Sequence, residues 1–475
     1  MTNTKNNKPL SNIVISGAGL SGLFLAKLIR FKGYDNPITI VEKSNFAGGQ
    51  FNSYKDKNLG LLDFGMHVYY DSCIDEIDSL IQSVVPDSEW NIYHGNYKDI
   101  AGIYFNGKLQ KSIPYPDLSN YPKNKIVEYL GEFMLEIKTN NKKEFASALD
   151  YYINQFGSKI TEEIIEPIMV KLHGKKLAEL DPICSKITNT DRVALFSKNI
   201  MVDLSKSDLL RSKLAFPDQL AIPKLREKNQ RALYPKKFGF KNLIDKLQFE
   251  LENFGVKFLF QSIIDNINYN TKVNSISIKN LNNNESTNIE NIDTLYWSSG
   301  MPSIANLLNI NLDGGFPDKR PKSYFIYFFL VSPPQMGELY YFYCYDEGFN
   351  TFRITNYSAY CDQANTGKGF PICIEYWPKE DLSKDDLLKS ATKEILDMKV
   401  INEESQIINS LIINGGAPPI PSIKNFNSIN SLRKSIEDKN ILNLVLTGLL
   451  ASKDTFFIPE VLTDAYNKFI KYSKI

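Results

Sequence analysis

The chain has 475 residues, 43% of them hydrophobic, and its 55 basic residues nearly balance 54 acidic residues to give a net charge of +1. A chain of this length exceeds one ordinary hydrophobic core, so we expect more than one domain. The balanced charge argues against nucleic-acid and membrane-surface partners. No stretch approaches the roughly 18 uninterrupted apolar residues of a membrane span. The polar start MTNTKNNKPLS lacks the apolar segment of a secretory signal, so we expect a cytoplasmic protein.

The cysteines and histidines indicate neither a disulfide framework nor a metal site. The five cysteines are odd in number and form no CxxC pair, which is typical of reduced thiols in a cytosolic protein. The three histidines are dispersed along the chain, so we predict no metal site.

The first predicted element is a strand at residues 13–15 that runs directly into a glycine-rich turn. The run Ile13-Val14-Ile15 is β-branched, as in a buried parallel strand. The three glycines of GAGLSG have the spacing of a dinucleotide-binding turn: one permits the tight turn, one lets the backbone approach a pyrophosphate, and one allows close helix packing. The helix predicted next would point its first N–H groups at the phosphates. The predicted cofactor contacts in this turn are Gly17, Ala18, Gly19, Leu20, Ser21 and Gly22.

A second strand is predicted at PITIVEK, which ends at Glu42, twenty residues after Gly22, with Lys43 as the next candidate contact. An acidic side chain at this position accepts hydrogen bonds from ribose hydroxyls and repels a 2′-phosphate, which disfavours NADP. The alternative is a glycine-rich turn without a ligand. This unit alone does not separate FAD from NAD.

The next two segments carry a resemblance to a known family. SNFAGGQFNS places a second glycine pair at Gly48-Gly49, and LGLLDFGMHVYY contains the pattern D-x-G-x-H at residues 63–67. With the preceding unit, the chain resembles the flavoprotein superfamily of amine oxidases, protoporphyrinogen oxidase, phytoene desaturases and UDP-galactopyranose mutase. The resemblance implies FAD, and we assume that it binds noncovalently. In that superfamily an arginine usually follows the glycine pair, whereas this chain has the uncharged Gln50.

The resemblance continues through four later segments, at residues 166–182, 232–251, 255–267 and 293–303, and in the closing strand and helix at 443–470. It implies an adenine contact at Ile264, a pyrophosphate or ribityl contact at Gly448, and a helix aimed at the pyrimidine edge of the flavin near Val461. Gly49 and Gln50 are implied near the phosphates, and Gly65 and His67 beside the flavin ring. The family often has aspartate or arginine where this chain has Leu449.

The resemblance also implies the domain organisation. The FAD-related motifs fall in residues 1–72, 232–300 and 437–475, so we expect a Rossmann-like α/β FAD-binding domain that is discontinuous in sequence. The intervening segments would form an α+β substrate domain. Its helical part is predicted at 73–231, where apolar residues recur every three or four positions, and its mixed or antiparallel sheet lies within 301–436, where β-branched and aromatic runs occur.

Two residues are candidates for catalysis. His67 follows the glycine of the predicted flavin loop and is placed to contact the cofactor or to shuttle a proton; the alternative is a core histidine satisfied by backbone groups. Arg353 lies in the predicted strand NTFRITNYS, where its guanidinium suits a carboxylate or phosphate of the substrate. The alternative for Arg353 is a strand arginine that pairs with a neighbouring acidic residue.

Aromatic residues follow the same predicted strands. The tyrosines would either stack on a sugar or base or fill the core of the sheet; they are Tyr340, Tyr341, Tyr343, Tyr345 and Tyr357. Glu375 in CIEYW is a polar strand residue or a substrate contact.

The leading hypothesis is therefore an FAD-dependent oxidoreductase that passes a hydride between a small soluble substrate, an amine or a nucleotide-sugar-like molecule, and the flavin. One alternative is a redox-neutral nucleotide-sugar mutase of the UDP-galactopyranose mutase type. Others are a porphyrinogen oxidase, a carotenoid-type desaturase, and a flavoprotein that only carries electrons. The sequence leaves the substrate, the electron acceptor and the oligomeric state open.

Overall fold

We describe a computed structural model of the chain. It places residues 10–137, 144–224, 230–310, 318–320, 322–365, 367–416, 418–453 and 455–472. Within these ranges, no helix is both long enough and apolar enough to cross a membrane.

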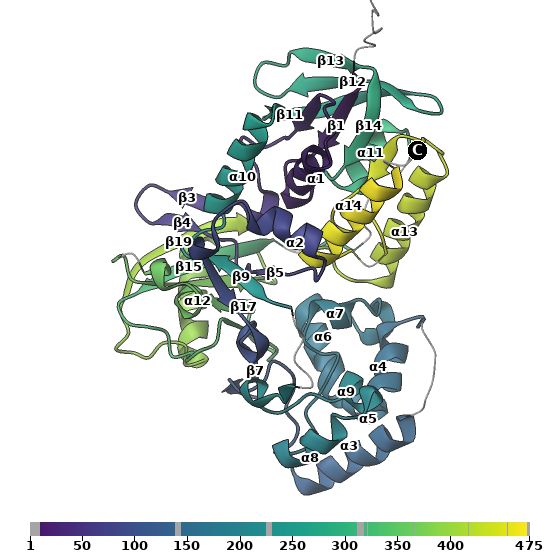
Figure 1. Cartoon of the computed structure of the whole chain (residues 1–475). Helices are drawn as coiled ribbons and strands as arrows, with labels where there is room; N and C mark the ends of the chain where they lie inside the picture. Colours follow the sequence, from purple (N-terminus) through teal and green to yellow (C-terminus); the bar gives the residue numbers. More distant parts are fainter. Residues whose placement is uncertain are drawn as a thin grey trace, which may run out of the picture.

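A five-stranded parallel sheet lies at the centre of the upper part of the molecule (Figure 1). Its strand order is β10-β2-β1-β14-β20. The bounds are β1 Asn12–Ser16, β2 Ile38–Val41, β10 Val256–Leu259, β14 Ile292–Trp297 and β20 Leu444–Leu446. The strands come from parts of the chain that are far apart in sequence, so the cofactor-like motifs at both ends and in the middle meet in one layer.

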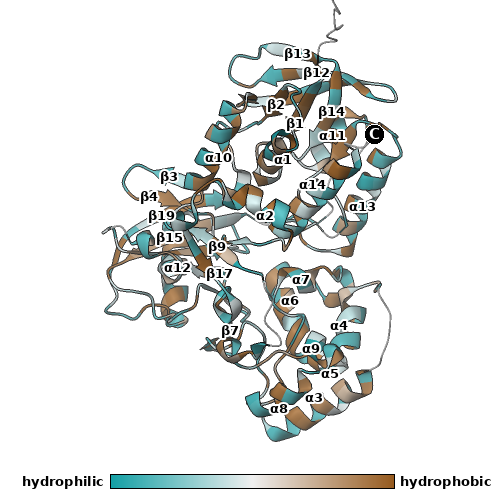
Figure 2. Cartoon of the chain, in the orientation of Figure 1, coloured by the Kyte–Doolittle hydropathy of each residue, from teal (hydrophilic) through white to brown (hydrophobic). Residues whose placement is uncertain are grey.

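Helices cover both faces of this sheet. On one face, α1 Leu20–Phe31 contacts α2 Asp75–Gln82, α10 Lys241–Asn253 and α14 Ile458–Tyr472. On the other face, α11 Met301–Leu307 and α13 Ile423–Glu437 share a core with an antiparallel sheet. The strands of that sheet are β11 Ser262–Tyr269, β12 Val273–Asn280 and β13 Ser286–Glu290. Burial on both faces explains why β1 and β14 are mostly hydrophobic (Figure 2).

A second, seven-stranded sheet has the order β19-β15-β18-β17-β16-β7-β8. All its pairs are antiparallel except β16 with β7, so the sheet is mixed, as predicted. The bounds are β7 Ala101–Phe105, β8 Lys108–Gln110, β15 Ser323–Leu330, β16 Tyr341–Cys344, β17 Thr351–Asn356, β18 Phe370–Tyr376 and β19 Ile407–Gly415. Helix α12 Lys384–Asp397 is tied to the sheet through Glu394, whose carboxylate accepts bonds from Thr351 and Tyr376.

Most of the helices between residues 123 and 213 gather below this sheet (Figure 1). They are α3 Lys123–Glu136, α4 Ala148–Phe156, α5 Ser158–Ile160, the π-helical turn η4 Thr161–Ile165, α6 Glu166–His173, α7 Cys184–Ile187, α8 Lys198–Leu204 and α9 Asp208–Lys213. Short 3-10 turns occur at η1 Gly49–Phe51, η2 Asp87–Glu89, η3 Gly95–Tyr97, η5 Leu177–Glu179, η6 Gln219–Ala221, η8 Tyr357–Ala359 and η9 Asp362–Ala364.

The segment 73–231 is not as helical as predicted. It contributes β6 Trp90–Tyr93, β7 and β8. β6 joins a small sheet with β5 Tyr69–Tyr70 and β9 Ala232–Pro235, and β3 Tyr54–Asp56 pairs with β4 Gly60–Leu62. These runs are short, and the partners that stabilise them lie up to about 240 residues away, as for β7 and β16. Local periodicity therefore could not reveal them.

Candidate functional site

The glycine-rich turn after β1 is closed on its helix side and open on its outer side. A Cβ atom on Gly22 would lie 2.1 Å from the carbonyl oxygen of Gly17, so only glycine lets α1 pack this closely on the turn. Gly17 has a φ of +100°, and a Cβ there would meet Ser298 Oγ at 2.7 Å. A Cβ on Gly19, in contrast, would meet nothing within 4 Å. The open side at Gly19 is where a ligand can approach the backbone.

Glu42 lies at the end of β2, and its carboxylate faces this turn. Oε2 accepts a hydrogen bond from the backbone N–H of Ala18 at 2.8 Å, and Oε1 accepts one from Ser44 at 2.8 Å. The side chain is half-buried, whereas Lys43 is exposed. Ile264, predicted beside the adenine, is only 6% exposed and packs in the core shared with α11 and α13. The residue that passes closest to Glu42 in this strand is Ser262, whose N–H donates to the Glu42 carbonyl at 3.0 Å.

The second glycine pair packs against the first turn. The N–H of Gly48 donates to the carbonyl of Ala18 at 2.7 Å, and Gly48 has a φ of +103°. A Cβ on Gly49 would lie 3.4 Å from the Cα atom of Gly19. Gly49 and Gln50 are exposed. The two turns therefore form one backbone surface around Gly19.

The end of the chain returns to the same place. Gly448 has a φ of +92°, and a Cβ there would lie 3.3 Å from the carbonyl oxygen of Ser298. Ser298 Oγ in turn donates to the carbonyl of Ser16 at 2.8 Å. Leu20, Ser21 and Val461 are buried at the starts of α1 and α14. The sequence reasoning missed Ser298 and Ser299, although the segment WSSG that follows β14 carried the signal.

The loop at residues 63–67 is fixed by a buried aspartate. Asp63 is 2% exposed, and its carboxylate accepts bonds from Ser53 Oγ and Tyr234 Oη, both at 2.5 Å, and from the N–H of Phe240 at 3.1 Å. Burial raises the pKa of Asp63 above its usual range, while these three donors oppose that shift. The carbonyl of Asp63 accepts bonds from Tyr327 at 2.8 Å and Tyr357 at 2.5 Å. The loop is therefore anchored from β9 of the small sheet and from β15 of the seven-stranded sheet.

Gly65 lies against the ion pair that Arg353 forms with Glu375. Gly65 has a φ of +73°, and a Cβ there would lie 2.5 Å from Glu375 Oε1. Arg353 donates from Nε to the same Oε1 at 2.5 Å and from Nη1 to Tyr343 Oη at 3.3 Å. The side chains of Arg353 and Glu375 are 18% and 11% exposed. Of the two readings of Arg353, the structure shows a pair with a neighbouring acid; whether its remaining N–H groups also contact substrate stays a prediction.

His67 follows on the same loop and packs edge-on against Phe51, with ring centroids 5.1 Å apart. Burial, and then the charge of Arg353, lower the pKa of His67 to about 4. The imidazole is therefore neutral near pH 7, so it can donate or accept a hydrogen bond but carries no charge. Among the described residues, none lies within hydrogen-bond distance and geometry of its Nδ1 atom, although the backbone of Phe64 and Gly65 lies close enough to oppose the fall in its pKa.

The predicted tyrosines divide into two groups. Tyr340 and Tyr357 are tied to backbone carbonyls, of Tyr97 and Asp63 respectively. Tyr341, Tyr343 and Tyr345 alternate along β16 and its end on the side of Arg353. The guanidinium lies 5.6 Å from the ring of Tyr341 and 5.5 Å from that of Tyr343, and Tyr345 stacks on Tyr343 at 6.2 Å. These rings form one wall beside the ion pair.

Asp99, just before β7, is a functional candidate that sequence reasoning missed. Tyr341 Oη donates to its Oδ2 at 3.4 Å, the Tyr70 hydroxyl also faces the carboxylate, and Oδ1 has no partner within hydrogen-bond distance in the described part of the chain. Burial raises the pKa of Asp99 above its usual range. Nothing in the local sequence NYKDIAG marks this residue, because only the parallel pairing of β7 with β16 brings it to Tyr341.

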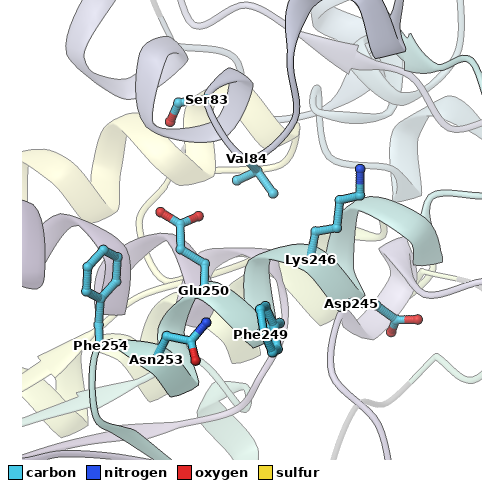
Figure 3. Close-up of a pocket in the computed structure, with 8 residues that line it drawn as sticks. All are labelled: Ser83, Val84, Asp245, Lys246, Phe249, Glu250, Asn253 and Phe254. Carbon is cyan, nitrogen blue, oxygen red and sulfur yellow. The ribbon is translucent and has the colours of Figure 1, made fainter.

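Two pockets elsewhere in the molecule do not coincide with the glycine-rich turns or with the tyrosine wall. One, of about 600 Å³, lies between the end of α2 and α10, and Figure 3 shows Ser83 and Val84 facing Lys246, Phe249 and Glu250 across it. Glu250, which lines it, is paired with the buried Lys27 at 2.9 Å. The other, of about 500 Å³, contains the Arg231–Asp71 ion pair. Neither brings together groups suited to catalysis.

Comparison with known proteins agrees with this geometry. The model of an NAD(P)-binding Rossmann-like domain matches residues 15–78. Coproporphyrinogen III oxidase of Staphylococcus aureus is 23% identical over 268 residues, which are 54% of this chain and 54% of that protein. The chain thus spans about half the length of this curated relative.

Two solved structures cover nearly the whole chain. Reduced UDP-galactopyranose mutase superposes with a TM-score of 0.71 at 15% identity, over 98% of this chain and 96% of that one. A protein of Exiguobacterium sp. 255-15, provisionally assigned as a protoporphyrinogen oxidase, superposes with a TM-score of 0.67 at 14% identity, over 98% and 99%. The predicted fold class is confirmed. The chain has the fold of these two structures, with an NAD(P)-binding Rossmann-like unit at residues 15–78.

Proposed function

We propose that the protein is an FAD-dependent oxidoreductase that binds FAD noncovalently and transfers a hydride between a small soluble substrate and the flavin. The observation that carries the proposal is the backbone surface around Gly19, which is open on its outer side and has the carboxylate of Glu42 beside it. A dinucleotide needs such a surface for its pyrophosphate and such a carboxylate for its ribose.

The residues present fit FAD. A side chain at Gly19 would fill the open space that a pyrophosphate needs; Gly22 lets α1 pack closely on the first turn, and the N–H of Gly48 joins the second turn to Ala18 of the first. In this proposal the turn 17–22, Gly49, Gln50 and Gly448 hold the phosphates and ribityl chain. Glu42 accepts the ribose hydroxyls, and Ser262 lies nearer than Ile264 to the adenine end.

The flavin supplies the hydride chemistry when it is bound. The chain supplies a fixed loop at residues 63–67, which Asp63 anchors and the Arg353–Glu375 pair supports from below. His67 stays neutral and offers one unpartnered nitrogen for a hydrogen bond. The tyrosine wall of β16 holds an unsaturated or polar substrate against this loop and excludes water.

A second candidate is a redox-neutral nucleotide-sugar mutase. It is favoured by a second arginine, Arg192, whose guanidinium lies 4.5 Å from the ring of Tyr115. Tyr345 lies close to Tyr115 and extends the tyrosine wall from Arg353 towards Arg192. Two guanidiniums along one wall suit a diphosphate. This wall is lined with polar groups, so it gives no comparable support to a porphyrinogen oxidase or a carotenoid-type desaturase.

Anaerobic titration of the purified yellow protein tests the proposal. An oxidoreductase is reduced by its substrate, so the flavin absorbance near 450 nm bleaches with one equivalent of product formed. A mutase is active only after prior reduction and consumes no electrons. Protein that takes up no FAD on reconstitution, and whose properties are unchanged by Glu42→Ala, refutes both readings.

A further inference from the structure

The charges along the tyrosine wall are paired, except one. Arg353 is bonded to Glu375, and Arg192 lies 3.4 Å from a carboxylate oxygen of Asp191. Among the residues that the structure describes, Asp99 forms no ion pair; the hydroxyls of Tyr341 and Tyr70 face its carboxylate, and its Oδ1 atom has no partner within hydrogen-bond distance. Its sequence neighbour Lys98 donates to Gln230 instead. A carboxylate left with an unpartnered buried oxygen requires a partner that the protein does not supply.

The side chains closest to the Asp99 carboxylate are aromatic. Tyr341 donates a hydrogen bond to the Asp99 carboxylate, and Tyr70 of β5 lies beside that carboxylate. Burial and the neighbouring carboxylate raise the pKa of Tyr70 well above its usual value, and burial does the same for Tyr341. Both hydroxyls therefore remain neutral. Asp99, Tyr70 and Tyr341 combine a carboxylate with aromatic rings, which is the chemistry that recognises a cation.

We propose that Asp99 binds a protonated nitrogen of the substrate, so that the substrate class is an amine or another cationic nitrogen compound. The inference rests on the proposed function, because it places the substrate on the tyrosine wall. An anionic group at the same place would meet the uncompensated carboxylate, whereas Arg353 has its charge balanced by Glu375. The ion pair with Glu375 therefore offsets the positive charge that Arg353 would otherwise present near Asp99.

This assignment predicts that the binding of a cation at Asp99 depends on pH. Burial disfavours the ionised carboxylate of Asp99, so cation binding strengthens as the pH rises through its elevated pKa and weakens below it. The charged groups that face Asp99 are Lys98 and Arg353, and the pKa of Arg353 is raised further by Glu375. Tyr70 and Tyr341 stay neutral, and His67, with a pKa of about 4, titrates only at the acid end.

Three probes of one shape and different charge test the proposal: benzylamine, benzyl alcohol and benzoate. Their binding to the FAD-loaded protein is measured by calorimetry and by perturbation of the flavin spectrum. We expect benzylamine to bind at least tenfold more tightly than benzyl alcohol, and benzoate to bind weakest. Asp99→Asn keeps the shape and removes the charge, so the preference for the amine and its pH dependence should both disappear. Asp385→Asn, at an exposed position in the first turn of α12, should keep both.

Tighter binding of benzoate than of benzylamine overturns the proposal in favour of an anionic substrate. It is equally overturned if the amine preference survives in Asp99→Asn, or if benzylamine does not bind at millimolar concentration. The flavin spectrum of the same sample separates this outcome from failure of the proposed function. Protein that retains FAD but shows no amine preference refutes the role of Asp99 alone, whereas protein that binds no FAD refutes the function.

Discussion

Gly19 and Gly22 lie three residues apart in the same turn, yet the structure gives opposite expectations for their replacement. Gly19 is the N-cap residue of α1, with φ −68° and ψ 171°, a conformation that any residue adopts, and its Cβ position is open. We therefore expect Gly19→Val to lower stability only by the preference for glycine at an N-cap, about 1 kcal/mol. In a chain of this size that corresponds to a decrease of roughly 2 to 4 °C in Tm.

Its effect on FAD should be much larger. The valine side chain would occupy the space through which a pyrophosphate reaches the backbone, and relieving such an overlap costs about 3 kcal/mol. We expect the dissociation constant for FAD to rise by about 100-fold. Gly22→Ala, in contrast, should lower the stability of the fold. Its Cβ would lie 2.1 Å from the Gly17 carbonyl, so α1 must shift by about 1 Å, which destabilises the fold itself by about 3 kcal/mol or more.

The assay compares apo-protein stability by urea denaturation with FAD affinity by fluorescence quenching, in wild type and both variants. Gly19→Val should fail only in the FAD measurement, and Gly22→Ala in both. If Gly19→Val binds FAD with unchanged affinity, the open side of the turn is not the pyrophosphate site, and the central argument for the cofactor is wrong. An equal loss of stability in the two variants would show that the space beside Gly19 is not open.

Three further predictions concern the loop at residues 63–67. Gly65→Ala combines a positive φ with a contact of 2.5 Å to Glu375, so it should lower the free energy of unfolding by about 2 kcal/mol more than Gly33→Ala, where φ is also positive but the space is empty; equal urea midpoints would refute the close packing. Asp63→Ala leaves three donors without their acceptor and should cost about 3 kcal/mol, measured by urea denaturation; a loss below about 1 kcal/mol would contradict the anchoring role. His67 has a folded pKa of about 4 against 6.5 in the unfolded chain, so the unfolded state binds its proton first and stability falls as the pH drops from 6.5 to 4, by up to about 3 kcal/mol. His67→Gln should flatten this part of the stability profile, and an unchanged slope would show that His67 is not buried in its neutral form.

The dinucleotide-binding unit could be predicted from the sequence because its determinants are local. Strand, glycines, helix, second strand and Glu42 lie within about 30 residues, and each position has a steric or electrostatic reason that needs no knowledge of the rest of the fold. The tyrosines of β16 were visible in the sequence, but the position of Asp99 beside them could not be predicted in the same way. Asp99 and Tyr341 are 242 positions apart and meet only because β7 pairs with β16. Such pairing depends on the order of strands in the sheet, which single-sequence periodicity does not contain.

Arg353 illustrates how strand register decides between two chemical readings of one residue. In the sequence, an arginine among aromatic residues suits both a substrate anion and an internal ion pair. The register of β17 with β18 places Arg353 directly opposite Glu375, and directly opposed side chains of unlike charge attract each other across antiparallel strands. Because Glu375 also touches Gly65, the pair lies beneath the loop that carries His67. The charge of Arg353 then lowers the pKa of His67, and Glu375 balances that charge. We therefore expect Arg353 to act mainly on the loop and Asp99 to set the charge that a substrate meets.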